Sequence, residues 1–274
     1  MLTIGLVLWV TTSPVSAAGI LPPRNPKANI APKPNYTTSG NCSFIDGGWR
    51  CANPCVTAKA TFPAYSNGAK CTAYILRAVD AARKKEHLGP MGLPSNWLKL
   101  SPSEQLFVLA DLERVARGLP PYLGINKALK AEAQLAAKQD RDPTIAPGFA
   151  VGLDPQGDYG MGGAWAEGFS TVAADYGWMY DDGWGGSVRN TPNLACTSAK
   201  AAACWAHRDE LLGYDPKFNP GVGLHCTDCE MGTGFAIVSG FGSFVDLVEL
   251  PAGKAPPVIF SWARNVKPYL PKHH

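Results

Sequence analysis

The sequence lacks a hydrophobic run long enough to cross a membrane. Its most apolar stretch, Leu2–Val10, lies at the N-terminus and is far shorter than the roughly 20 residues that a membrane-spanning helix needs. We therefore expect no transmembrane segment and a soluble product.

The sequence also lacks a strong charge of either sign. The formal net charge is +3, and no block of Lys and Arg is interleaved with aromatic residues, as is typical of nucleic-acid-binding surfaces. We expect that nucleic acid is not a partner and that the chain is a monomer.

A positive charge before Leu2–Val10 is missing as well, but the run otherwise has the features of a secretion signal. Small residues follow it, and Val15-Ser16-Ala17 suits signal peptidase. The pattern predicts a signal peptide over residues 1–18 and an exported chain that is secreted, extracellular or held in the cell envelope. A buried N-terminal strand is the alternative.

Cysteine is absent between Cys71 and Cys196, and the eight cysteines form groups of four on either side of that gap. An even number in an exported chain indicates disulfides. Each group allows three pairings, and the short separations favour Cys42–Cys51, Cys55–Cys71, Cys196–Cys204 and Cys226–Cys229. Alternatively, the last pair could bind zinc, with Cys196 and Cys204 as the two further ligands.

Composition and periodicity divide the chain into five parts. We expect a signal peptide (1–18), a flexible Pro-rich tether (19–40), a disulfide-stapled extension and linker (41–100), a main domain (101–252) and a C-terminal tail (253–274).

Helices are expected before strands in this order. Ser101, Pro102 and Glu104 have the pattern of a capped helix start. Further helices are predicted at 74–85, 127–140, 169–181 and 205–212, loops at 142–163, and strands at 222–225, 235–238 and 245–250. In the helix at 127–140 the residues expected to face inward are Leu129, Ala133, Leu135 and Ala136. This order indicates an α+β fold.

A series of short motifs runs from Ser101 to about Leu250. They are Arg117-Gly118-Leu119-Pro120-Pro121-Tyr122, Leu129 with Ala133, Ala166-Glu167-Gly168, Trp178 with Asp181, Trp205-Ala206-His207-Arg208-Asp209-Glu210-Leu211-Leu212-Gly213, and Gly221-Val222-Gly223. Their order resembles the CAP superfamily (cysteine-rich secretory proteins, antigen 5 and plant pathogenesis-related proteins; the SCP domain), and most of all its bacterial branch. The resemblance implies a three-layer α-β-α sandwich with an open cleft.

The resemblance also implies which residues line that cleft. The family places two histidines and two acidic residues there, and the matching positions are Glu167, Asp181 and His207. No histidine occurs from 88 to 206, so the first histidine has no counterpart. Trp178 and Trp205 are expected to contribute to binding at the same cleft.

Two kinds of chemistry could use these three residues. One imidazole and two carboxylates could hold a divalent cation, and they could serve as acid and base catalysts. Alternatively, His207 hydrogen-bonds within the cleft and pairs with Glu167. No Ser or Cys nucleophile is evident, since Ser170 is expected to cap a helix. Apart from a divalent cation, no cofactor is expected.

Aromatic residues crowd the same part of the chain, namely Trp165, Tyr176, Trp178, Tyr180, Trp184 and Trp205. They could bind sugars or lipids, or pack as ordinary core. Our leading hypothesis is an exported CAP-like module that binds an extracellular lipid, glycan or protein in the cleft. The alternatives are an extracellular hydrolase, metal-assisted or acid–base, and a structural envelope protein.

Overall fold

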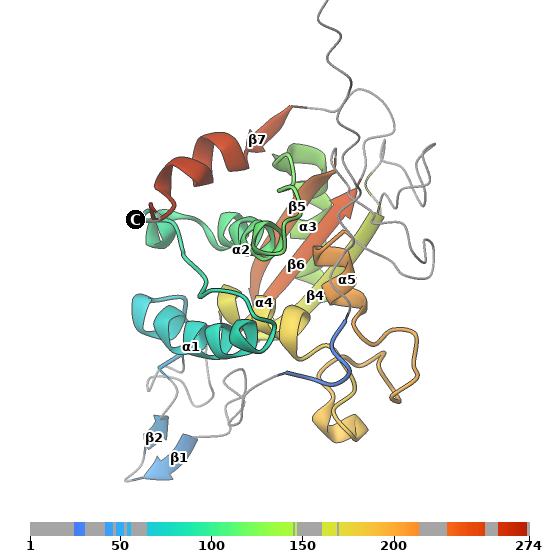
Figure 1. The fold of residues 1–274 in the computed structure, drawn as a ribbon. Coiled ribbons are helices and arrows are strands. Elements are labelled where there is room, and N and C mark those ends of the chain that lie inside the picture. The colour runs from blue at the N-terminus through green and yellow to red at the C-terminus, as the bar shows by residue number, and fades with distance from the viewer. Residues whose placement is uncertain are drawn as a thin grey trace, which may run out of the picture.

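A five-stranded mixed sheet forms the centre of the molecule (Figure 1). The computed structural model describes residues 25–30, 42–45, 48–51, 54–55, 65–144, 146, 161–168, 170–213, 229–249 and 257–272. The strands, in spatial order, are β4 (Met161–Gly168), β6 (Phe241–Glu249), β5 (Glu230–Val238), β3 (Ile125–Asn126) and β7 (Val258–Phe260). Neighbours are antiparallel except β3 and β5, which are parallel.

Helices cover both faces of this sheet (Figure 1). On one face lies α3 (Lys127–Gln139). On the other lie α2 (Pro102–Ala116), α4 (Thr171–Tyr180) and α5 (Ala206–Leu211), and α1 (Ala69–Lys85) packs against α4. The α+β class and the three-layer α-β-α arrangement are therefore confirmed.

The strand register sorts the core into two clusters. Val245 and Leu247 of β6 face α3, where Leu129 and Ala133 are buried. Phe244, on the opposite face, belongs to the larger cluster that includes residues of α1, α2 and α4. Because successive strand residues point to opposite faces, one strand serves both clusters.

Two helices begin as the sequence predicts. Ser101 caps α2 through a complete capping box, in which the Ser101 amide donates to the Glu104 carboxylate at 2.8 Å. Ser170 caps α4, since its hydroxyl oxygen accepts from the Ala173 amide at 3.1 Å. These caps satisfy amides that the first helical turn leaves without partners.

The start of one strand was predicted as loop. β4 begins inside the Gly/Pro-rich segment 142–163. A Cβ at Gly162 would overlap Glu210 of α5, and one at Gly163 would overlap Pro143. The glycines here serve close packing against the strand, so their low strand propensity misled the prediction.

The expected C-terminal tail is part of the domain. β7 pairs with β3, and Phe260, Trp262 and Val266 are buried. The Phe260 ring meets Phe107 of α2 edge-on, with 5.7 Å between centroids. A π-helical turn (Trp262–Val266) and a 3-10 turn (Lys267–Tyr269) follow. Burial of these apolar residues fixes the segment.

The predicted extension and tether also contact the domain. Ile75 and Val79 of α1 lie in the main core, so the expected boundary at 101 separates parts that share one core. Within the predicted tether, the Ile30 amide donates to the Tyr180 carbonyl at 3.1 Å, and Asn25 donates to Asp209 at 2.7 Å. Residues 25–30 therefore lie docked beside α4 and α5 (Figure 1).

Two of the predicted disulfides are present, Cys55–Cys71 and Cys196–Cys204. Cys42 and Cys51 are register partners in the hairpin of β1 (Cys42–Ile45) and β2 (Gly48–Cys51). Cys229 is disulfide-bonded, but its predicted partner Cys226 lies outside the described residues. The predicted signal peptide and the predicted strand at 222–225 lie outside them too.

Two further 3-10 turns complete the described elements, at Trp97–Lys99 and at Val188–Asn190. Across the part of the chain that the structure describes, no helix has both the length and the apolar character needed to span a membrane.

Candidate functional site

A cleft of about 330 Å³ opens between β4, α4 and the start of α5. Its fourth wall is the segment 192–194, which precedes the Cys196–Cys204 disulfide. The lining residues are Trp165, Ala166, Glu167, Gly168, Ala173, Ala174, Gly177, Trp178, Asp181, Asp182, Pro192, Asn193, Leu194 and His207. Glu167, Asp181 and His207, the three residues implied by the family resemblance, thus line one cleft.

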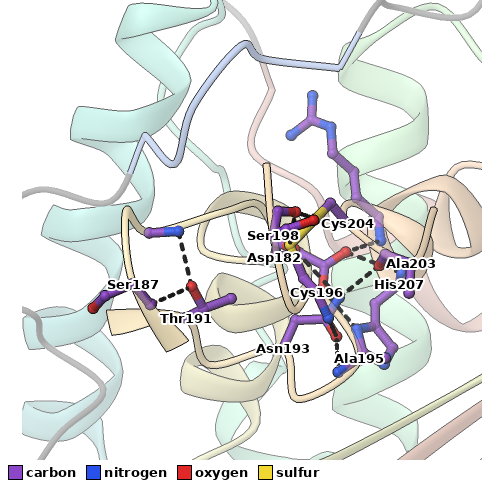
Figure 2. Close-up of a disulfide and its surroundings, with 12 residues drawn as sticks. Asp182, Ser187, Thr191, Asn193, Ala195, Cys196, Ser198, Ala203, Cys204 and His207 are labelled. Atoms are coloured by element: carbon purple, nitrogen blue, oxygen red, sulfur yellow. Dashed lines mark hydrogen bonds and ion pairs between the residues drawn. A yellow bond between two sulfur atoms is a disulfide. The ribbon is translucent and has the colours of Figure 1, made fainter. Parts of the chain in front are cut away.

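His207 is paired with Asp182 (Figure 2). Its Nδ1 lies 2.6 Å from Asp182 Oδ1, and its backbone amide donates to Asp182 Oδ2 at 3.0 Å. The Asp182 side chain is 1% exposed and that of His207 is 24% exposed. The carboxylate is therefore covered, while the imidazole keeps an edge open to solvent. No described residue bonds the His207 Nε2.

The pair changes the proton affinity of both groups. Burial by itself would lower the pKa of His207, but the hydrogen bond and charge of Asp182, helped by Asp142, raise it above its ordinary value. Burial raises the pKa of Asp182, although the bonds from His207, Arg208 and Asn193 act to lower it. The imidazole therefore keeps its proton to a higher pH than an exposed histidine.

Asp181 lies at the C-terminal end of α4, next to the pair. Burial, with the neighbouring charge of Asp182, raises the pKa of Asp181 to about 7. This carboxyl can therefore take up or release a proton near neutral pH.

Glu167 stands apart from the other two residues. It is exposed on β4, and its pKa is raised by partial burial and by the charge of Asp140 at the end of α3. The partner of His207 is Asp182, so the alternative of a His207–Glu167 ion pair is wrong.

The predicted metal site is not formed. Among the described residues no three His, Cys, Asp or Glu side chains converge to hold a metal ion. Glu167, Asp181 and His207 thus line the same cleft, but their side chains do not converge as the ligands of one metal ion would.

Most of the aromatic residues pack in the interior. Tyr176, Tyr180 and Trp205 are buried, and the Trp205 ring covers Gly183 and does not line the cleft. Trp178 and Trp165 do line it, and the Trp178 indole donates to the Trp165 carbonyl at 3.3 Å. Of the two tryptophans expected at the cleft, Trp178 thus lines it and Trp205 does not.

Asp182 is a residue of the site that the sequence motifs did not indicate. α5 starts after Trp205, whose side chain cannot cap a helix, so the first amides of α5 need an acceptor from elsewhere. Asp182 supplies it, since its Oδ2 accepts from the amides of His207 and Arg208. The absence of a capping residue before α5 is the feature of the sequence that could have indicated an acceptor from elsewhere.

Comparisons with known proteins do not show a family for this chain. No protein-family model matches the chain, and no curated protein does. A solved structure of Schistosoma mansoni venom allergen-like protein 4 is similar, with 16% sequence identity, coverage of 59% of this chain and 97% of that chain, and a TM-score of 0.32. At this TM-score the likeness decides neither the family nor the function of the chain.

Proposed function

We propose that this chain is an exported CAP-like module that binds an extracellular ligand in the cleft beside His207. The observation that carries the proposal is the His207–Asp182 pair. A buried carboxylate fixes the imidazole at the wall of a cleft with otherwise mostly apolar lining. A few fixed polar groups in an apolar cleft are typical of ligand sites.

The chemistry of the lining favours a glycan. Asp181 and Glu167 offer carboxyl oxygens that accept hydrogen bonds, and Trp165 and Trp178 lie on the same cleft. A ligand rich in hydroxyl and amide donors with apolar ring faces complements both kinds of group. A fatty acid would instead place its own carboxylate beside these two carboxyls, and like charges repel.

Two observations support export. The leader at residues 1–18 has the pattern of a signal peptide. The described part of the chain also contains two disulfides, Cys55–Cys71 and Cys196–Cys204, which persist in oxidising compartments.

Binding can be tested by calorimetry with a soluble N-acetylglucosamine tetrasaccharide, with laurate and with an unstructured peptide as probes. We expect the saccharide to bind and His207→Ala to weaken it by about tenfold or more, since one charged hydrogen bond is worth that much. His87→Ala is the matched control, because His87 is exposed outside the cleft.

Binding of laurate or peptide in place of the saccharide would change the ligand class. If none of the three binds, and native mass spectrometry of the protein from its own secretion shows no bound molecule, the binding proposal is wrong. The structural envelope role then remains.

A second candidate is an acid–base hydrolase, and the titration of Asp181 favours it. A carboxyl with a pKa of about 7 next to a His–Asp pair can act as acid or base near neutral pH. The described lining residues include no Ser, Thr or Cys, so water would be the nucleophile. Release of shorter saccharides that Asp181→Asn abolishes, with binding retained, would support it. Equal rates in wild type and variant would exclude it.

A further inference from the structure

The side chain of Asn193 joins Asp182 to the neighbouring disulfide loop (Figure 2). Its Nδ2 donates to Asp182 Oδ1 and to the Ala203 carbonyl, both at 2.8 Å. Its Oδ1 accepts from the amides of Ala195 at 3.0 Å and Cys196 at 3.2 Å. Asn193 is 6% exposed, so both ends of the buried amide find their partners inside the protein.

The orientation of this amide follows from its neighbours. A flipped Asn193 would place its oxygen against the Asp182 carboxylate and the Ala203 carbonyl, and its NH₂ group against two amide donors. Every one of these contacts would be repulsive, so only the observed orientation is compatible with the surroundings.

The Cys196–Cys204 disulfide joins the two chain segments that supply partners of the Asn193 amide (Figure 2). Cys196 itself provides one of the amides that Asn193 accepts from. Cys204 directly follows Ala203, whose carbonyl is the acceptor on the other side. The bond joins positions eight residues apart, so it keeps the donor and the acceptor at a fixed separation.

Asn193 holds one oxygen of the Asp182 carboxylate, Oδ1, while the other, Oδ2, accepts from the amides of His207 and Arg208. Besides His207, Asn193 is the one described side chain that bonds its carboxylate. The Asp182 carbonyl accepts from the Trp205 amide at 3.1 Å, which ties the main chain to the residue after Cys204. Asn193, just before the loop that the disulfide closes, thus binds the side chain of Asp182, and Trp205, just after that loop, binds its main chain.

We propose that Asn193, clamped by the Cys196–Cys204 disulfide, is a positioning residue that holds the Asp182 carboxylate where His207 Nδ1 can donate to it. The inference deepens the proposed function, because it concerns the same cleft. Through Asn193 and Asp182 the loop sets the orientation of the imidazole, and opening the disulfide releases it.

The hydrogen bond itself is the readout, observed by NMR of the ¹⁵N-labelled imidazole rings. His207→Ala identifies the His207 signal. We expect a low-field Nδ1–H proton that exchanges slowly with water in the wild type. In Asn193→Ala, and in the double variant Cys196→Ser/Cys204→Ser, this signal is expected to disappear by exchange. Asn190→Ala, exposed in the 3-10 turn Val188–Asn190, should keep it.

The Trp178 indole proton reports separately on the folded cleft wall, because it donates to the Trp165 carbonyl. Loss of the His207 signal with the Trp178 signal retained supports positioning. An unchanged His207 signal in Asn193→Ala overturns it, and so does loss of both signals in both variants, which would make the loop a requirement for folding. The test needs no ligand, so a failure of ligand binding would count against the proposed function alone.

Discussion

His207 and Asp182 change each other's proton affinity, because a 2.6 Å hydrogen bond joins them. The folded-state pKa of His207 lies above its ordinary value of 6.5. The stability that this provides is complete below the unfolded-state pKa and is lost as the pH rises through the folded-state pKa.

Removing the charge of Asp182 should reverse the effect on His207. In Asp182→Asn we expect the pKa of His207 to fall, because burial then acts without an opposing carboxylate. NMR titration of the imidazole measures it. Asp140→Asn, at the end of α3 and outside the pair, is the control and should leave the curve unchanged. A His207 curve that is the same in Asp182→Asn would mean that the pair does not exist in solution.

Asp246 is a second titrating residue, inside the protein. It is fully buried, and neither carboxyl oxygen has a hydrogen-bond partner among the described residues. Burial raises its pKa from 3.8 to about 8. Burial is the cause of this shift, so the protonated form is preferred in the folded state.

Stability should therefore fall as the pH rises between the two pKa values of Asp246, because the folded state binds more protons there. The slope from this group is at most about 1.4 kcal/mol per pH unit. Asp246→Asn should flatten the curve of unfolding free energy, measured by urea denaturation between about pH 5 and pH 8. Part of the slope should stay, since burial also raises the pKa of Asp175 and Glu210. Equal slopes in variant and wild type would contradict the assignment.

At the scale of elements, α3 and β5 pack closer than side chains on both would allow. A Cβ at Gly232 would overlap the backbone of Leu129, and one at Gly234 would overlap the Ala133 carbonyl. The helix can approach the strand so closely because these two positions have no side chain.

We expect Gly234→Ala to lower the free energy of unfolding by about 1–3 kcal/mol or more, because the helix must move outward to admit a methyl group. Denaturant unfolding measures this loss. Gly89→Ala is the control, since nothing lies within 4 Å of its Cβ position. A loss no larger than that of the control would show that α3 can shift freely.

At the scale of the whole molecule, a buried ion network joins four helices. Glu113 of α2 accepts from Arg83 of α1 at 2.6 Å and from Arg117. Arg117 also pairs with Glu86, at the end of α1, and Glu86 accepts from Arg208 of α5 at 2.6 Å. The Tyr180 hydroxyl of α4 donates to Glu113 at 2.6 Å as well.

Glu113→Gln should therefore destabilise the whole fold, by about 3–5 kcal/mol, because it leaves buried guanidinium charges without a counterion. Thermal or urea unfolding checks this, with Glu132→Gln on the outer helix α3 as the control. A change similar to that of the control would mean that the charges are hydrated or compensated elsewhere.

The sequence by itself determined the features that depend on neighbouring residues. The caps at Ser101 and Ser170 and the two short-range disulfides follow from local spacing, and the order of helices and strands predicts the α+β class. One predicted side-chain direction is wrong. Leu135, expected to face inward, is exposed, and Ala137 is buried in its place.

Only the tertiary structure decided which distant residues meet. The glycines of β4 and the apolar residues of β7 became strands because helices and strands elsewhere in the chain pack on them. Asp182 became the partner of His207, 25 residues away, because α5 has no cap of its own and takes one from the end of α4. Local pattern cannot encode such a pairing, since its free energy comes from contacts that exist only once the chain has folded.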